Sequence, residues 1–366
     1  MIESFFYAQP VKIRFGEGCF DQLGELLDEL GVRRAVLVSG RHFAPEAERL
    51  MAQDTRFVAA YCAVEQNPQL AGVEETVRLC RAHGADAVIG VGGGSAMDTA
   101  KYAAAVAPNE GDAIDYYRGE RSLDAARRLT ILAVPTTAGT GSEVTQVSVI
   151  SHGEEKKTTN HPAFMPTAAV VDPALTYSVP PRTTMNTGLD AMAHAIEGYW
   201  SVNHQPVTDV LAVEAVRLVL ENLERAYTDG SDRDARSAMS FASLLAGLSF
   251  AQPKTAACHA CSYPLSERYH LPHGEACAFT LDSFVRLNAD ERLEKLARGA
   301  GLKDTAELAG RIRALKELGG LRRRLADLGE VDVPSLAAAC LRHPLMNNNP
   351  RRFTEEELVA MFEALR

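Results

Sequence analysis

The chain has 366 residues, more than a single hydrophobic core normally serves, so two domains are expected. Hydrophobic residues make up 46% of it and charged residues 23%, which is the composition of an ordinary globular protein. The formal net charge is −10 and the basic run at residues 322–324 is short, which excludes nucleic acid as the main partner because phosphate binding needs a concentrated basic face.

The sequence predicts neither a secretory signal nor a membrane span. The N-terminal stretch lacks a positive region followed by an apolar core, and no run approaches the roughly eighteen apolar residues of a membrane helix. The seven cysteines are odd in number and scattered, which does not indicate a disulfide framework. A reducing cytoplasm is therefore the expected location.

The first half of the chain alternates short apolar runs with helix-like stretches. The runs end in Gly, Pro or Ser and lead into helices, which is typical of a mostly parallel sheet covered on both faces. They fall at residues 33–40, 86–107, 129–143, 144–151 and 168–174. We expect an α/β domain over residues 1–180.

A glycine-rich turn lies within the second of these runs. Gly92, Gly93 and Gly94 are followed by Ser95 and an alanine-rich helix. Glycine lets a backbone approach a ligand closely, and a helix N-terminus offers free N–H groups to an anion. The turn therefore indicates a phosphate or pyrophosphate. The pattern is neither GxGxxG nor a P-loop, so a tight turn without a ligand is an equal alternative for this stretch alone.

Two neighbouring features favour a ligand at this turn. Asp98 and Lys101 lie on the first turns of the following helix. Hydroxyl groups also gather after the next apolar run, where open α/β sheets hold their ligands. These candidate residues are Thr136, Thr137, Thr140 and Ser142.

The composition changes after Pro180 and Pro181. Runs of β-branched residues disappear, and Ala, Leu and Glu dominate with apolar residues at helical spacing, as in residues 209–227 and 294–329. We place the domain boundary here and expect an all-helical domain over residues 181–366.

The helical half carries a candidate metal site. Asp190 and His194 are four residues apart, so on a helix they share one face and can reach a common ion. His259 and His273 would complete a set of one Asp and three His, which suits a catalytic Fe(II), Zn(II) or Mn(II). For Asp190 and His194 taken alone, a solvated helix face with a weak pair stays open.

The same region offers two rival groupings. Cys258 and Cys261 with His270 and His273 would make a structural zinc site, but the spacing matches no common finger, and Cys258 directly precedes His259, so their side chains would diverge. A redox pair of the two cysteines needs a thioredoxin-type βαβ context, which the helical half does not provide. A catalytic metal site is the preferred interpretation.

Taken together, these motifs resemble the iron-dependent, group III alcohol dehydrogenases, which share the dehydroquinate synthase-like fold. The resemblance covers nearly the whole chain through "PVKIRFGEG", "GGGSAMDTAK", "PTTAGTGSEVT", "GLDAMAHAIEGYW" and "PHG". It implies a Rossmann-like first domain, an all-helical second domain and a homodimer. It also implies that residues 92–95 bind the pyrophosphate of NADPH or NADH, that Thr136 and Thr137 contact the nicotinamide half, and that the four metal candidates bind Fe(II).

Such a site implies direct hydride transfer between C4 of the nicotinamide and the carbinol carbon of a small alcohol or aldehyde, with the metal as Lewis acid. A lyase of the dehydroquinate synthase type and a cofactor-binding scaffold without metal chemistry are the alternatives. The sequence lacks the dense Lys and Arg set that the lyase substrate would need. Four retained metal candidates oppose the scaffold.

The chain departs from the family pattern at a position near the metal motif. Many members carry a histidine four residues after the first histidine of the C-terminal pair, and here that residue is Tyr263. Tyr263 could relay a proton or only pack against the substrate. His270 is a second candidate for proton relay, with an ordinary loop histidine as the alternative.

A second departure concerns the cofactor. Many members carry an acid after the first apolar run, positioned to bind the adenosine ribose, whereas this chain has Gly40 and Arg41. Replacing a carboxylate by a guanidinium favours the additional phosphate of NADPH, with NADH as the alternative. That Arg41 is a surface residue pointing elsewhere also stays open.

A third departure concerns the substrate. Lys254 precedes His259 by five residues and should lie near the pocket if the helix there is regular. With Arg268 and with Arg351 or Arg352 it indicates an anionic substrate. Solvated positions of Lys254 and Arg268 without a ligand are an equal alternative. The segments "KTAACHA" and "SYPL" resemble the subgroup that reduces phosphonoacetaldehyde to 2-hydroxyethylphosphonate.

Overall fold

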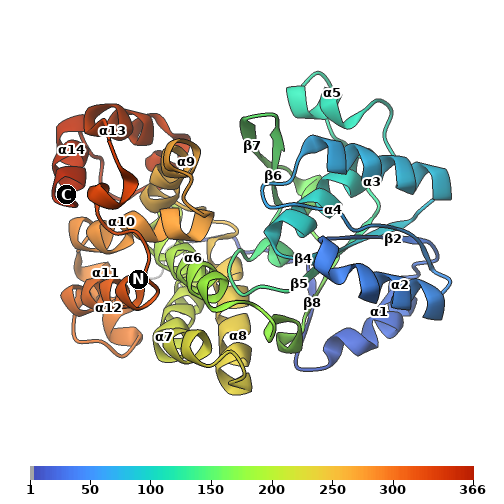
Figure 1. Ribbon diagram of the computed structural model, residues 1–366, viewed down its shortest axis with the longest axis horizontal. Helices are drawn as coiled ribbons and strands as arrows, with labels where there is room; N and C mark the ends of the chain where they lie inside the picture. Colours follow the sequence, from blue (N-terminus) through green and yellow to red (C-terminus); the bar gives the residue numbers. More distant parts are fainter. Residues whose placement is uncertain (1–3) are drawn as a thin grey trace. The chain divides into compact units, whose positions relative to one another are not determined.

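The computed structural model describes residues 4–366, so the first three residues of the predicted domain 1–180 lie outside it. Contacts divide the chain into two compact units (Figure 1). The sheet unit holds residues 9–137 and 141–176, and the helical unit holds residues 4–8, 138–140 and 177–366. The second unit thus resumes at Tyr177, close to the predicted boundary at residue 180.

The sheet unit is built on six strands that all pair in parallel. Their order is β1 (Lys12–Phe15), β8 (Ala168–Val171), β5 (Thr130–Pro135), β4 (Ala87–Gly92), β2 (Ala35–Ser39) and β3 (Phe57–Tyr61). Short apolar runs that lead into helices were expected to form such a sheet, and this prediction is confirmed.

Alternation along each strand creates two cores. On β2, Val36 and Val38 point into one core and Ala35 and Leu37 into the other, because successive side chains point to opposite faces of a sheet. The first core is covered by α3 (Leu70–His83), α4 (Gly94–Val106) and α5 (Ala113–Arg118). The second is covered by α1 (Leu23–Glu29) and α2 (Ala44–Gln53), so both faces are closed (Figure 1).

One apolar run forms a strand outside this sheet. The run at residues 144–151 contributes β6 (Val147–His152), which pairs antiparallel with β7 (Glu155–Asn160) in a separate hairpin. A short apolar run predicts a strand but not its partner, so the sequence did not distinguish this hairpin from the parallel strands.

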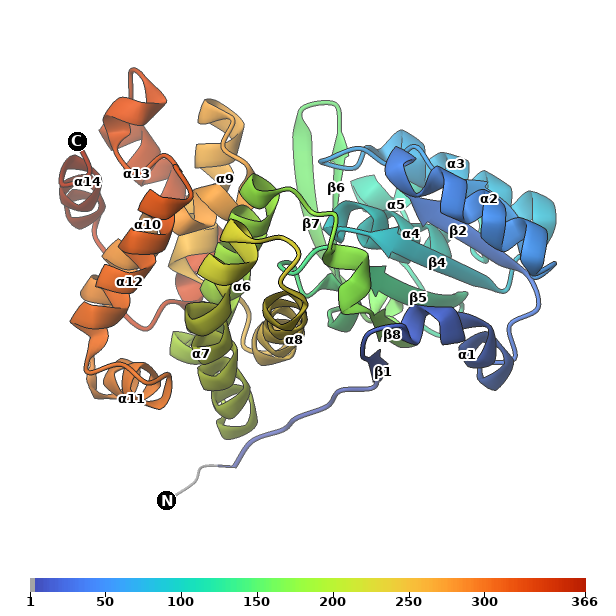
Figure 2. The same cartoon turned by 60° about the horizontal axis from the view of Figure 1, so that its bottom comes forward.

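The helical unit contains only helices in the part that the structure describes, as predicted (Figure 2). They are α6 (Pro181–Trp200), α7 (Pro206–Thr228), α8 (Arg233–Phe250), α9 (Ala257–Tyr269), α10 (His273–Leu287), α11 (Glu291–Gly299), α12 (Thr305–Leu318), α13 (Val333–Arg342) and α14 (Glu355–Glu363). Helix α6 is buried nearly all round between residues 184 and 200 and contacts α7, α8 and α10. A helix of this kind forms the centre of a bundle and can present polar side chains to an enclosed site.

Short 3-10 helices connect the larger elements. They lie at η1 (Cys19–Gln22), η2 (Arg41–Phe43), η3 (Ser142–Val144), η4 (Pro162–Phe164), η5 (Pro173–Thr176), η6 (Leu325–Leu328) and η7 (Pro344–Asn348). Within residues 4–366, none of the helices is both long enough and apolar enough to cross a membrane. All seven cysteines are free thiols.

Candidate metal centre and nucleotide-binding loop

Three helices of the helical unit bring the four predicted metal ligands together. Helix α6 supplies Asp190 and His194, α9 supplies His259, and α10 begins with His273. The Asp190 Oδ1 atom lies 3.9 Å from His194 Nδ1 and 3.8 Å from the Nε2 atoms of both His259 and His273. One carboxylate oxygen is thus close to all three imidazoles.

The orientation of two imidazole rings is set by hydrogen bonds on the far side of each ring. His194 Nδ1 lies 3.3 Å from the carbonyl oxygen of Gly139, and His259 Nδ1 contacts the Glu197 carboxylate. When each Nδ1–H donates in this way, each Nε2 presents its lone pair to the cluster. The two Nε2 atoms face each other at 3.0 Å. Two lone pairs at that distance repel unless a proton or a metal cation lies beside them.

A cation at this position would also compensate the buried negative charge of Asp190. Asp190, His194 and His259 are buried, whereas the side chain of His273 is 38% exposed. Burial and the neighbouring imidazoles hold the pKa of His194 well below its usual value, so this ring is in the neutral form that binds metals. One carboxylate, three imidazoles and a partly open side suit a divalent metal ion with space for a substrate.

Close backbone contact fixes the distance between two of these helices. Gly274 follows His273, and a Cβ atom there would collide with the Asn186 carbonyl oxygen and lie 3.2 Å from the Cβ of Asp190. The absence of a side chain at residue 274 therefore lets α10 approach α6 closely enough for His273 to reach Asp190.

Glu197 contacts the candidate metal centre and was not predicted from the sequence. Its carboxylate is fully buried, and Oε1 accepts N–H groups from Ala256, Cys258 and His259 at 3.0, 2.7 and 3.3 Å. Oε2 contacts His259 Nδ1. Glu197 therefore caps the start of α9 and orients a candidate ligand. Its spacing of seven residues from Asp190, two helical turns on the same face, was the available signal.

Two more side chains near the cluster were not predicted. Cys277 lies one turn after His273 on α10, with Sγ 3.8 Å from His273 Nε2. His343 stacks on Tyr263 with ring centroids 4.3 Å apart, and burial followed by the charge of His259 lowers its pKa. The spacing of His273 and Cys277 could have indicated a shared helix face, but nothing local indicates the contact of His343 with Tyr263.

The three predicted catalytic residues lie in different environments. Tyr263 is half-buried one turn after His259 on α9, whereas His270 is exposed at the end of that helix, in the left-handed backbone region with φ 53°. The premise for Lys254 was wrong, because α9 begins at Ala257 and Lys254 precedes it in a loop with φ 71°. Lys254 Nζ donates to the carbonyl of Ala251 at 2.9 Å, and burial lowers its pKa.

The other basic residues proposed for an anionic substrate lie elsewhere on the helical unit. Arg268 is exposed and donates to Ser335 Oγ at 3.2 Å. Arg351 pairs with Glu357, and Arg352 donates to Asn347 Oδ1 at 2.6 Å. These contacts engage the three guanidinium groups within the protein. The rival zinc grouping is not assembled, since Cys258 and Cys261 are buried in the helical core while His270 is exposed.

In the sheet unit, the predicted glycine turn joins β4 to α4. Gly92 has φ 153°, and a Cβ atom there would lie 2.8 Å from Ala96 Cβ. Gly93 precedes the first residue of the helix, Gly94, and approaches Thr137, whose Oγ1 would lie 3.4 Å from a Cβ at residue 93. Gly93 has no side chain to cap the first turn, so the N–H groups beyond it can serve an anion.

A glycine earlier on the strand brings helix and strand into close contact. A Cβ at Gly90 would lie 2.8 Å from Ala100 Cβ and 2.9 Å from Met97 Cα. This packing places the N-terminus of α4 at the carboxyl end of β4, where α/β sheets hold phosphates.

Asp98 and Ser142, two predicted cofactor contacts, interact with each other inside the sheet unit. Ser142 Oγ donates to Asp98 Oδ1 at 2.7 Å, and Asp98 Oδ2 accepts the Val149 N–H at 2.8 Å. The buried Lys101 ammonium donates to Ser142 Oγ at 2.6 Å, and burial lowers its pKa to about 8. These contacts join α4 to η3 and β6 and give Asp98 and Ser142 a structural role.

The remaining predicted cofactor residues lie at strand ends. Thr136 N donates to the Gly92 carbonyl at 3.0 Å, which joins the two loops, while Thr140 belongs to the segment that clusters with the helical unit. Gly40 and Arg41 follow β2 directly, and Arg41 is exposed at the start of η2. Contact of these residues with a nucleotide stays a prediction.

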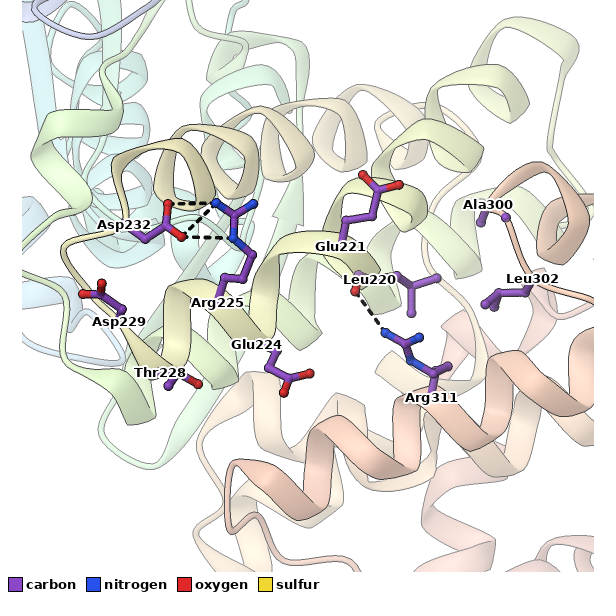
Figure 3. A pocket seen from close by; sticks show the side chains of 11 residues that line it. Leu220, Glu221, Glu224, Arg225, Thr228, Asp229, Asp232, Ala300, Leu302 and Arg311 are labelled. Carbon is purple, nitrogen blue, oxygen red and sulfur yellow. Dashed lines mark hydrogen bonds and ion pairs between the residues drawn. The ribbon is translucent and has the colours of Figure 1, made fainter.

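A pocket of about 620 Å³ lies elsewhere in the helical unit (Figure 3). It is lined by Leu220, Glu221, Glu224, Arg225, Thr228, Asp229, Asp232, Ala300, Gly301, Leu302 and Arg311. None of the metal-cluster residues lines it, and its two arginines are engaged: Arg225 pairs with Asp232, and Arg311 donates to the Leu220 carbonyl. The pocket is therefore distinct from the candidate metal centre.

Comparison with known proteins identifies the family of the chain. Residues 184–366 match the model of the Fe-containing alcohol dehydrogenase family, C-terminal, and residues 10–173 match that of iron-containing alcohol dehydrogenase. The chain belongs to the iron-containing alcohol dehydrogenase family. Membership in this family makes it an oxidoreductase, and the family resemblance seen in the sequence is confirmed.

Relatives in the iron-containing alcohol dehydrogenase family match along their whole lengths. Long-chain-alcohol dehydrogenase 1 of Geobacillus thermodenitrificans is 36% identical over 97% of this chain and 95% of its own. The structure of sulfoacetaldehyde reductase from Bifidobacterium kashiwanohense in complex with NAD+ is 39% identical, with a TM-score of 0.95 over 99% of both chains. A 1,3-propanediol oxidoreductase structure has a TM-score of 0.90 and 32% identity, covering 100% of both chains. These relatives differ in substrate, so they do not test the resemblance to phosphonoacetaldehyde reductases.

Proposed function

We propose that the protein is a metal-dependent NAD(P)H oxidoreductase that interconverts a small aldehyde and its primary alcohol by direct hydride transfer. The observation that carries this proposal is the pair of imidazole Nε2 atoms, on His194 and His259, that face each other at 3.0 Å beside the buried Asp190 carboxylate. A cation relieves the repulsion between the lone pairs and neutralises the carboxylate. Fe(II) fits the family, and the same donors accept Zn(II) or Mn(II).

In this proposal the residues of the helical unit hold and orient the ion. Asp190, His194, His259 and His273 would bind it, and when bound it would supply Lewis-acid polarisation of a substrate oxygen. Glu197 fixes the tautomer of His259. We favour Tyr263 over His270 for proton relay, because Tyr263 lies one turn from His259 while His270 is exposed at the helix end.

In the sheet unit, the N-terminus of α4 would bind the cofactor pyrophosphate through the N–H groups that follow Gly93. Thr136 and Thr137 would lie along the nicotinamide half. Gly40 offers no carboxylate to repel a 2′-phosphate, and the exposed Arg41 can pair with one, so we propose NADPH as the preferred cofactor. NADH is the alternative, in line with the NAD+ in the sulfoacetaldehyde reductase complex.

For the substrate we propose a small anionic aldehyde, with phosphonoacetaldehyde the first candidate. The 39% identity to a sulfoacetaldehyde reductase supports this class, since sulfoacetaldehyde is also a two-carbon aldehyde with an anionic group. Lys254, half-buried in the loop that leads into α9, is the proposed partner of the anion. On family grounds we also propose a cytoplasmic homodimer.

The test follows the absorbance of NADPH with anaerobic protein loaded in turn with Fe(II), Zn(II) and Mn(II). The substrates are phosphonoacetaldehyde, sulfoacetaldehyde and an uncharged aldehyde of similar size. We expect net NADPH consumption that is selective for the anions and that falls in Lys254→Ala but not in Lys303→Ala, a surface control. Equal use of charged and uncharged aldehydes would overturn the anionic class. Absence of oxidation of both NADPH and NADH with every metal would overturn the activity itself.

A further inference from the structure

The metal cluster contains a fifth donor that the iron-binding interpretation does not use. Cys277 follows His273 by one helical turn on α10, and it is fully buried. The donor atoms of Asp190, His259, His273 and Cys277 all lie within 4.8 Å of one another. Asp190, His259 and His273 can therefore bind a metal ion together with either His194 or Cys277 as the fourth ligand.

Three donor separations in the cysteine-containing set lie at the upper end of the edges expected for a zinc tetrahedron. Ligands about 2.0–2.3 Å from a zinc ion lie roughly 3.3–3.8 Å from one another when the geometry is tetrahedral. Asp190 Oδ1 is 3.8 Å from both His259 Nε2 and His273 Nε2, and Cys277 Sγ is 3.8 Å from His273 Nε2. The edge between His194 and His259 is only 3.0 Å, so a tetrahedral ion bound by both must push these rings apart.

The thiol also lies in a polar setting. A buried cysteine usually fills space among apolar side chains, as a small hydrophobic residue. Cys277 belongs to the apolar core of the helical unit, but it also shares its helix face with His273, because residues four apart on a helix point the same way. Its sulfur lies at the polar end of that face, beside the imidazole and near the Asp190 carboxylate.

We propose that Cys277 is a metal ligand in this chain and that its sulfur shifts the preference of the site from Fe(II) towards Zn(II). The proposal rests on the metal site assigned above. When the ion binds, the thiol proton passes to the solvent and the metal takes its place on sulfur. Thiolate is a soft donor and suits zinc better than the oxygen and nitrogen ligands of a pure Asp and His set.

The test replaces the metal by Co(II), which reports its ligands by absorption. A cobalt–thiolate bond gives a sulfur-to-metal charge-transfer band in the near ultraviolet, while the weaker visible bands report any tetrahedral cobalt. We expect the wild-type protein with one equivalent of Co(II) to show both. Cys277→Ser should keep the bound cobalt and lose the charge-transfer band. Cys340→Ser, a buried control whose thiol hydrogen-bonds with Cys261 in the same unit, should keep it.

A second measurement covers the case in which Cys277→Ser folds poorly. The affinities of Zn(II) and Fe(II) for wild type, Cys277→Ser and Cys277→Ala are compared by competition with a chelator, with circular dichroism as the folding check. We expect the ratio of zinc to iron affinity to fall about tenfold in the variants that fold. The inference is overturned if wild-type cobalt protein shows visible bands without the charge-transfer band, while the proposed enzyme function then stands. If the wild type binds no Co(II), Zn(II) or Fe(II), both are overturned.

Discussion

At the scale of single residues, the candidate site depends on the groups that orient the metal-binding side chains as much as on those side chains themselves. Motif spacing could predict Asp190, His194, His259 and His273, because paired donors one turn apart and clustered histidines are visible in a sequence. It could not predict the contact of His194 with the Gly139 carbonyl, because every residue has a backbone carbonyl and the sequence does not show which one lies near the ring. The tautomers that expose both Nε2 atoms are therefore a property of the fold.

Replacing Glu197 with Gln is expected to weaken metal binding by about 10–100-fold. The amide nitrogen would face His259 Nδ1 and favour the tautomer with a proton on Nε2, where a metal cannot bind. The dissociation constant for Zn(II), measured against a chelating indicator, checks this outcome. Glu214→Gln on α7 is the control, since Glu214 is partly exposed and pairs with Arg217. Equal affinities in both variants would contradict a role for Glu197 in positioning His259.

Glu143 is expected to make stability depend on pH. Burial raises its pKa from 4.5 to about 6 in the folded protein, so the folded state holds this proton more tightly than the unfolded state. The resulting stabilisation is full below pH 4.5 and is lost as pH rises through 6. The Glu143→Gln variant has no carboxyl group to ionise at this position. Its free energy of unfolding minus that of wild type should therefore rise by about 2 kcal/mol between pH 4.5 and 7.

Urea unfolding across that pH range measures the effect. Glu154→Gln, an exposed change in the turn between β6 and β7, serves as the control and should track wild type at every pH. A constant difference between Glu143→Gln and wild type would show that this carboxyl does not bind its proton more tightly in the folded state.

At the scale of elements, the start of α9 is set by a residue that is distant in the chain. Lys254 was expected near the pocket on the condition that a regular helix runs from it to His259. The helix begins at Ala257 instead, where the Glu197 carboxylate on α6 accepts the first N–H groups. A cap supplied from almost sixty residues away in the chain leaves no local signal, unlike the Ser, Thr and Asp caps that sequence rules recognise.

The contact of β4 with α4 is expected to tolerate no side chain at residue 90. Gly90→Ala should lower the free energy of unfolding of the sheet unit by about 1–3 kcal/mol, because the new Cβ meets Ala100 Cβ at 2.8 Å and the Met97 backbone at 2.9 Å. Urea denaturation followed by circular dichroism measures the change. Gly310→Ala on α12, where a Cβ meets nothing within 4 Å, should instead stabilise slightly. Neutral behaviour of Gly90→Ala would contradict the close packing.

At the scale of the whole molecule, the proposed sites fall in different units. All five metal-cluster side chains belong to the helical unit, and the proposed pyrophosphate turn belongs to the sheet unit. The sequence predicted this division from a change of composition, because parallel sheets need β-branched runs while helical bundles favour Ala, Leu and Glu. It could not predict that residues 138–140 belong to the helical unit, because this assignment depends on tertiary contacts.

Removal of the metal is expected to destabilise the helical unit selectively. An ion at about a hundred times its dissociation constant adds roughly 2.7 kcal/mol to the folded state. Hydrogen exchange with and without a strong chelator should show faster exchange in α6, α9 and α10, with little change in β2, β4 and β5. NADPH should give the converse pattern, with protection at the start of α4. Uniform changes over both units would contradict separate sites.

The backbone contact at Gly274 has a consequence for attempts to alter the enzyme by mutation. Since even one methyl group at this position meets the Asn186 carbonyl, every other amino acid would move α10 away from α6 and take His273 from Asp190. A gene library designed to broaden the range of substrates must therefore keep the glycine codon at this position. Useful diversity is expected at side chains such as Tyr263 and His343, which lie beside the cluster without setting the spacing of its helices.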